Sequence, residues 1–160
     1  MAEYSTVNLG ELEKFGDKLL KQQESIAIEK AVEYAKNRMI EAYNSSEYWR
    51  RTGNLDDSFC WIVCYKGEKK AHGFLEEMPT ANKSYSEKGT TKTGRGEAEK
   101  FIAKYTPEYK NGLEIVFAAT TFYASMLEYG NERPVKQVLM GIKDMLNHDF
   151  GLVNVLIKKI

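Results

Sequence analysis

The segment 58–66 is apolar on both faces of the strand that its alternation predicts. Successive side chains of an extended chain point to opposite faces, and aromatic and β-branched residues favour strands. One face holds Phe59, Trp61, Val63 and Tyr65, and the other holds Cys60, Ile62 and Cys64. Such a strand needs cover on both faces, so we expect it in the centre of a domain or at an interface between chains.

Two amphipathic segments precede this strand. Apolar residues recur at steps of three and four between Leu9 and Leu20, which predicts a short N-terminal helix. A longer helix is predicted from Glu24 to Tyr43, because its apolar residues share one face: Ile28, Val32, Ala35, Met39 and Ala42. The polar run 44–46 is expected to end it, since Asn and Ser side chains compete for backbone hydrogen bonds.

The rest of the chain alternates between strand and helix signals. A polar turn at 66–70 and a return strand at 71–77 predict a hairpin, and a second alternating strand is expected at 113–120. Short helices are predicted at 97–105, at 122–129 and from Pro134 onward, whereas the apolar tail 152–160 fits a strand or a helix. The fold class expected is α+β, with a long amphipathic helix packed on a mostly antiparallel sheet and short N-terminal and C-terminal helices. At 160 residues, 1–160 is expected to form a single domain.

The segment 78–96 contains almost no large apolar residue, which predicts a long mobile loop within the domain. Deleting 80–93 is therefore expected to leave the fold intact. Four basic residues in this loop are candidates for contact with phosphate: Lys83, Lys88, Lys92 and Arg95. We favour the ordinary interpretation, a solvated loop, over a phosphate-binding patch.

Charge and composition favour no highly charged partner. The chain has 23 Lys and Arg against 23 Asp and Glu, so no net charge attracts nucleic acid or an acidic membrane surface. No apolar run approaches the ~20 residues of a membrane span, and the two cysteines are too few for a disulfide framework. We expect a protein of a reducing cytoplasm that does not enter a membrane.

No catalytic, cofactor-binding or metal-binding residue is predicted. The glycines of 89–96 resemble a phosphate-binding loop, but Arg95 and Gly96 replace the required Lys and Ser or Thr. Cys60 and Cys64 would lie about 13 Å apart on a strand, too far to share a zinc ion, and buried apolar cysteines are the better interpretation. His72 and His148 stand in no recognisable nucleophile motif. The chain is therefore expected not to be an enzyme.

Two short motifs are more specific. A Thr-Gly-x-Leu-x-x-Ser turn precedes the first strand, and a Tyr-Ala-x-x-x-Glu-Tyr-Gly segment precedes the last helix. In this order they resemble the small tail-component family of tailed bacteriophages, whose members are also described as head-tail joining, neck or tail-completion proteins. The matching residues are Thr52, Gly53, Leu55, Ser58, Tyr123, Ala124, Glu128, Tyr129 and Gly130.

The resemblance implies a structural virion protein, at the neck or tail end, that is assembled in the host bacterial cytoplasm. It implies a homo-oligomeric ring, hexameric by analogy, at the head-tail interface, with no catalysis and no cofactor. The partners implied are a head connector or adaptor and a tail-tube or tail-terminator protein, with DNA passing through the channel. An alternative from the residues alone is a small nucleic-acid-binding or regulatory domain that uses the basic loop 83–95. An enzyme of unrecognised type is the third reading.

Glu128 is predicted near the C-terminal end of a helix, where the helix dipole disfavours a carboxylate. We therefore expect it either to accept hydrogen bonds from the turn Thr52–Leu55 or from Arg50 or Arg51, or else to face water. The first arrangement would tie the two motifs together.

Overall fold

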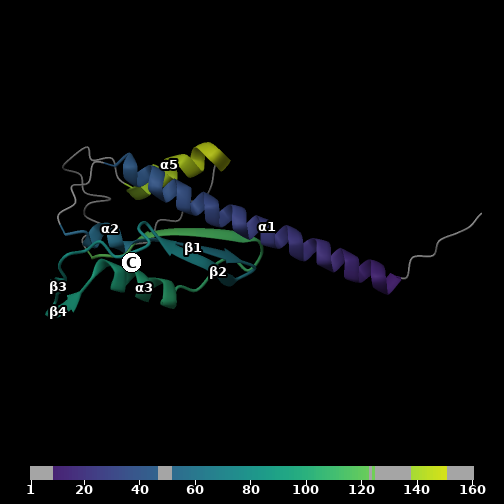
Figure 1. The fold of residues 1–160 in the computed structure, drawn as a ribbon, viewed down its shortest axis with the longest axis horizontal. Helices are drawn as coiled ribbons and strands as arrows, with labels where there is room; N and C mark the ends of the chain where they lie inside the picture. The colour runs from purple at the N-terminus through teal and green to yellow at the C-terminus, as the bar shows by residue number, and fades with distance from the viewer. Residues whose placement is uncertain (1–8, 47–51, 123, 125–137, 151–160) are drawn as a thin grey trace, which may run out of the picture.

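A computed structural model describes residues 9–46, 52–122, 124 and 138–150. It shows an α+β fold, as expected, with helices on both faces of an antiparallel sheet (Figure 1). The long helix α1 (Leu9–Asn44) precedes the short α2 (Asn54–Ser58), and these lead into a three-stranded sheet. The helices α3 (Gly94–Lys104) and α5 (Val138–Phe150) follow.

The helix α1 is continuous over 36 residues, so the separate short N-terminal helix is wrong. Lys21, Gln22, Gln23 and Glu24 join the two predicted segments, and all four are good helix formers with no Gly or Pro among them. The C-terminal half of α1 packs on the sheet, while the N-terminal part extends beyond it (Figure 1). The end of α1 at Asn44 agrees with the predicted polar stop.

The sheet has the strand order β2-β1-β5, and both pairings are antiparallel. Its strands are β1 (Phe59–Tyr65), β2 (Glu68–Phe74) and β5 (Leu113–Ala119). Lys66 and Gly67 form the turn between β1 and β2 with φ values of 50° and 78°, the positive pair that a tight two-residue hairpin requires. The return strand thus begins earlier than predicted, because the turn takes two residues instead of five.

The central strand β1 is covered on both faces, as its two apolar faces require. Phe59, Trp61 and Val63 pack with α1 and α5, and Cys60, Ile62 and Cys64 pack with α3. Burial raises the pKa of Cys60 to about 12 and that of Cys64 to about 11. The cysteines are thus buried side chains of the core, and the centre of a layered domain, rather than an interface, explains the strand's composition.

Gly73 leaves room for the indole of Trp61, its partner across the β1-β2 pair. A Cβ at Gly73 would lie 2.3 Å from a ring carbon of Trp61, which is well inside van der Waals contact. We expect Gly73→Ala to lower the free energy of unfolding by about 1 to 3 kcal/mol, because the indole must move within a packed core. Urea unfolding measures this, and Gly73→Ala with Trp61→Phe should lose less than the sum of the single changes.

The segment 78–96 is not a structureless loop, which corrects the prediction. It contains the hairpin of β3 (Tyr85–Glu87) and β4 (Thr90–Lys92), and it runs into the first turn of α3. Polar side chains from α2 hold the segment in place, whereas the prediction considered only its lack of large apolar residues. Its mobility stays a prediction.

The other predicted elements divide between the described residues and the remainder. The helix expected at 97–105 begins earlier, at Gly94, and the strand expected at 113–120 is β5. The helix expected from Pro134 is described as α5 from Val138. Most of the helix predicted at 122–129, and the tail 152–160, lie outside the described residues.

Candidate functional site

The turn into α2 is built for a close approach of two chain segments. Gly53 has φ +81°, a conformation that favours glycine, at the N-cap of α2. A Cβ there would lie 2.8 Å from the carbonyl carbon of Thr80, so a side chain would clash with backbone. The first motif therefore brings the segment after β2 against α2.

Asp57 fixes that contact from within α2. Its carboxylate is fully buried and accepts hydrogen bonds from the backbone N–H of Thr80, at 2.7 and 2.9 Å to its two oxygens. The hydroxyl of Thr80 donates at 2.8 Å, and the N–H of Ala81 donates at 2.8 Å. A buried carboxylate needs such donors, and all of these come from one short stretch of the chain. The carboxylate therefore orders residues 80 and 81.

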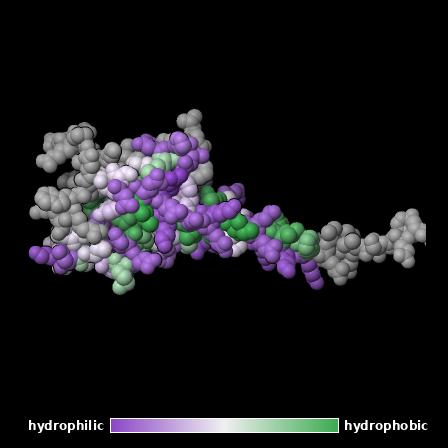
Figure 2. All heavy atoms as spheres, turned by 45° about the horizontal axis from the view of Figure 1, so that its top comes forward, coloured by the Kyte–Doolittle hydropathy of each residue, from purple (hydrophilic) through white to green (hydrophobic). Residues whose placement is uncertain are grey.

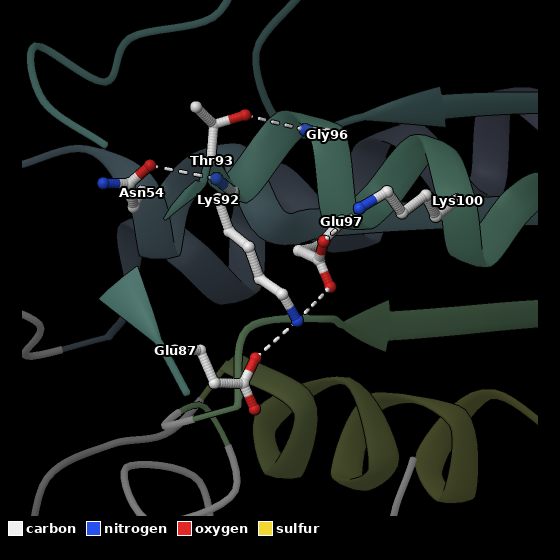
Figure 3. Close-up of polar contacts among 8 residues, drawn as sticks. Asn54, Glu87, Lys92, Thr93, Gly96, Glu97 and Lys100 are labelled. Atoms are coloured by element: carbon white, nitrogen blue, oxygen red, sulfur yellow. Dashed lines mark hydrogen bonds and ion pairs between the residues drawn. The ribbon is translucent and has the colours of Figure 1, made fainter. Parts of the chain in front are cut away.

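Asn54 likewise binds backbone groups of the segment 78–96, at positions nearer its C-terminal end (Figure 3). Its side-chain oxygen accepts from the N–H of Gly94 at 2.9 Å, and its amide nitrogen donates to the carbonyl of Lys83 at 2.6 Å. The two contacts span the β3-β4 hairpin. At the same point Thr93 caps α3 by accepting from the N–H of Gly96 at 3.1 Å.

An ion-pair chain then links the hairpin to α3 (Figure 3). The ammonium of Lys92 lies 2.5 Å from Glu87 and 3.3 Å from Glu97, and Glu97 also pairs with Lys100 at 2.9 Å. The hydrogen bond to Glu87, with a smaller one to Glu97, raises the pKa of Lys92. The hydrogen bond from Lys100, with a smaller one from Lys92, lowers the pKa of Glu97. Lys92 is thereby neutralised by carboxylates of its own chain.

Arg95 is buried rather than free to bind an anion. The side chain is only 8% exposed, and its guanidinium carbon lies 3.8 Å from the ring centroid of Phe74. It donates to the carbonyls of Glu76 at 2.6 Å and Glu77 at 3.4 Å. The guanidinium thus holds the chain that leaves β2.

The four basic candidates for phosphate contact are not presented as one patch. Lys83 and Lys88 have exposed side chains, whereas Lys92 is paired with carboxylates and Arg95 is buried. Two exposed lysines form a weaker site for an anion than the four basic residues in the sequence suggest.

The residues of the first family motif have architectural positions. Thr52 accepts hydrogen bonds from the backbone and side-chain amides of Asn54, at 3.4 and 3.3 Å. Leu55 packs against the core on the α1 side, and the Ser58 hydroxyl donates to the carbonyl of Leu55 at 2.7 Å. These contacts shape the entry into β1.

The second motif is described at one position. Ala124 is buried, and its N–H donates to the carbonyl of Thr121 at 3.0 Å. The other motif residues, Tyr123, Glu128, Tyr129 and Gly130, lie outside the described residues. The link between Glu128 and the turn Thr52–Leu55 therefore stays a prediction.

Another buried carboxylate, also missed from the sequence, orders the approach to β5. Glu114 accepts a hydrogen bond from the hydroxyl of Tyr105, and from the N–H groups of Glu108 at 3.1 Å and Tyr109 at 3.0 Å. Burial, followed by this hydrogen bond, raises the pKa of Tyr105 above its ordinary range. The alternation of apolar and polar residues in this strand predicts that Glu114 faces solvent, so the sequence gives no sign of its burial.

The chemistry of these groups is that of chain positioning. Both oxygens of Asp57 and both of Glu114 accept hydrogen bonds from the protein itself. Within the part of the chain that the structure describes, no three His, Cys, Asp or Glu side chains gather to hold a metal ion. No helix in the same residues combines the length and apolar character needed to cross a membrane. Comparison with protein-family models, curated proteins and solved structures finds no match for this chain.

Proposed function

We propose that this chain is a structural virion protein of a tailed phage or prophage. In this proposal it is the tail-completion or head-tail connector subunit, which forms a homo-oligomeric ring, hexameric by analogy, at the head-tail interface. Its partners are the head connector or adaptor on one side and a tail-tube or tail-terminator protein on the other, with DNA in the channel. No catalytic step or cofactor belongs to it, and assembly takes place in the host cytoplasm.

The observation that carries the proposal is the use of polar groups around the first motif. Asn54, Asp57 and Ser58 are buried, and their side chains bind backbone of their own chain. Buried polar groups whose hydrogen bonds are all made within the protein stabilise the fold, and this use favours a structural role over a catalytic one. This agrees with a family resemblance in which the turn precedes the central strand of an assembly subunit.

The nucleic-acid alternative receives less support from the described residues. Salt-dependent binding of DNA relies on cations free to meet phosphate. Lys92 is already paired with Glu87 and Glu97, and Arg95 is buried under the chain after β2. The proposal therefore assigns the basic segment to the packing of this domain.

The proposal is tested on particles made by the phage or induced prophage that encodes the chain. We expect the protein in purified virions, and we expect a null mutant to accumulate DNA-filled heads and tails that stay unjoined. Expression of the wild-type chain in trans is the control and should restore joined particles. Normal particles from the null mutant, or a chain absent from virions and bound to DNA in cells, would refute the proposal.

A further inference from the structure

The N-terminal part of α1 carries an apolar stripe that the rest of the described chain leaves uncovered. Phe15 is 59% exposed, Leu19 43% and Ile26 50%. Figure 2 shows hydrophobic residues along the part of α1 that projects from the molecule. Further along α1, Glu24 contacts the sheet region, where it pairs with Lys66 at 2.5 Å.

This stripe faces away from the protein's own core. Ile28 packs against the core cluster on the sheet, and it follows Leu19 by nine positions. Nine positions are about two and a half turns of helix, so the two side chains point in opposite directions. The core of the same chain therefore cannot cover Leu19 without unwinding α1.

The spacing of the stripe is that of a helix that pairs with another helix. Phe15, Leu19, Gln22 and Ile26 follow one another at steps of 4, 3 and 4, the alternation of a two-heptad seam. Gly16 lies beside the seam, where a Cβ would meet nothing within 4 Å, so a partner helix can come close. Such a seam fits an apolar helical partner rather than a flat surface.

The charges on this part of α1 favour a copy of the same helix over an anionic partner. The side opposite the seam carries Glu13, Lys14, Asp17, Lys21 and Glu24, which sum to 2 − 3 = −1. Phosphate or an acidic membrane would meet both signs there and gain little. Lys18 lies on one flank of the seam and the neutral Gln23 on the other, so two copies meet without a row of like charges.

We propose that α1 pairs with α1 of a second copy of this chain through the seam Phe15, Leu19 and Ile26. This contact is additional to the proposed ring and does not depend on it. The seam is about two heptads long, which is less surface than the ~800 Å² per partner of a standard interface. Pairing is therefore weak in dilute solution and strengthens with concentration or where other contacts already hold the copies together.

The test is sedimentation of the full chain between about 1 µM and about 1 mM, a range that covers weak dissociation constants. The wild-type average mass should rise toward that of two chains. Leu19→Glu should move the midpoint at least about tenfold higher, because a charge would enter the apolar seam. Leu20→Glu is the matched control: Leu20 is 59% exposed, lies about 100° round the helix from Leu19, and should leave the midpoint unchanged.

Circular dichroism checks that both variants keep the helix content of the wild type, and Phe15→Glu serves as a second seam variant. A wild-type chain of single mass throughout, or equal effects of Leu19→Glu and Leu20→Glu, would overturn the pairing. Such a failure of the pairing would leave the proposed function intact, because the proposed ring does not depend on this seam. Concentration-dependent pairing by a chain that is absent from virions would support the pairing and refute the proposed function.

Discussion

Gly94→Ala is expected to destabilise the protein by about 3 kcal/mol or more, because the new methyl group has no space. A Cβ at Gly94 would lie 1.8 Å from the carbonyl oxygen of Asn54 and 2.7 Å from its carbonyl carbon. Both are backbone atoms, and Asn54 is buried, so no side chain can rotate aside. Either α2 or the start of α3 must shift, and the shift breaks the 2.9 Å hydrogen bond from the N–H of Gly94 to Asn54.

Gly96→Ala is the matched control for this prediction. It adds the same methyl group two residues further along α3, where the nearest atom is the Thr93 hydroxyl oxygen at 3.0 Å. The hydroxyl can move only by weakening its cap bond to the N–H of Gly96, and the higher helix propensity of alanine offsets this loss, so we expect a net change within about 1 kcal/mol. Urea midpoints at unchanged m-values compare the two variants. Equal midpoints for both variants would show that the α2-α3 contact is looser than the structure indicates.

The layered arrangement could be predicted because it depends on apolar periodicity. The alternation in 58–66 required cover on both faces, and α1, α5 and α3 supply it. The apolar face at Ile28, Ala35 and Met39 likewise predicted the helix that packs on the sheet. Burial of apolar surface is the main favourable term in folding, so the apolar pattern is the feature of the sequence that predicts the structure best.

The segment 78–96 could not be predicted in the same way, because buried polar groups hold it. Asp57 reaches residues 80 and 81, and Asn54 reaches residues 83 and 94, from 23 to 40 positions away in the chain. Local sequence cannot tell a buried Asp from a solvated one, since the difference lies in distant backbone donors. Deletion of 80–93 would remove the donors of Asp57, so from the structure we expect this deletion to destabilise the fold, which is the opposite of the expectation from the sequence.

The division of α1 into two helices failed for a different reason. The apolar residues before Leu20 and those after Ile28 lie on opposite sides of one helix, and each run by itself predicts a helix. A break needs a residue that disfavours helix, and none stands between 21 and 24. The change of side marks two covering surfaces, the core of the chain for Ile28 and the proposed second copy for Leu19.

Asp57→Ala is expected to destabilise the protein by about 3 to 5 kcal/mol. The change removes the acceptor for the N–H groups of Thr80 and Ala81 and for the Thr80 hydroxyl. Each donor left buried without an acceptor costs about 1 to 3 kcal/mol. Urea unfolding measures the loss, and hydrogen exchange should show that the amides of Thr80 and Ala81 lose protection first.

Thr80→Val measures the contribution of one hydrogen bond to Asp57, since it removes the hydroxyl donor of Thr80 and keeps the backbone N–H. It should cost about 1 kcal/mol, and Asp57→Ala with Thr80→Val should lose less than the sum of the single changes, because both act on one hydrogen-bonded group. Asp57→Asn keeps one acceptor oxygen and should fall between wild type and Asp57→Ala. A loss below about 1 kcal/mol for Asp57→Ala, with the protection of Thr80 unchanged, would show that other contacts hold the segment against α2.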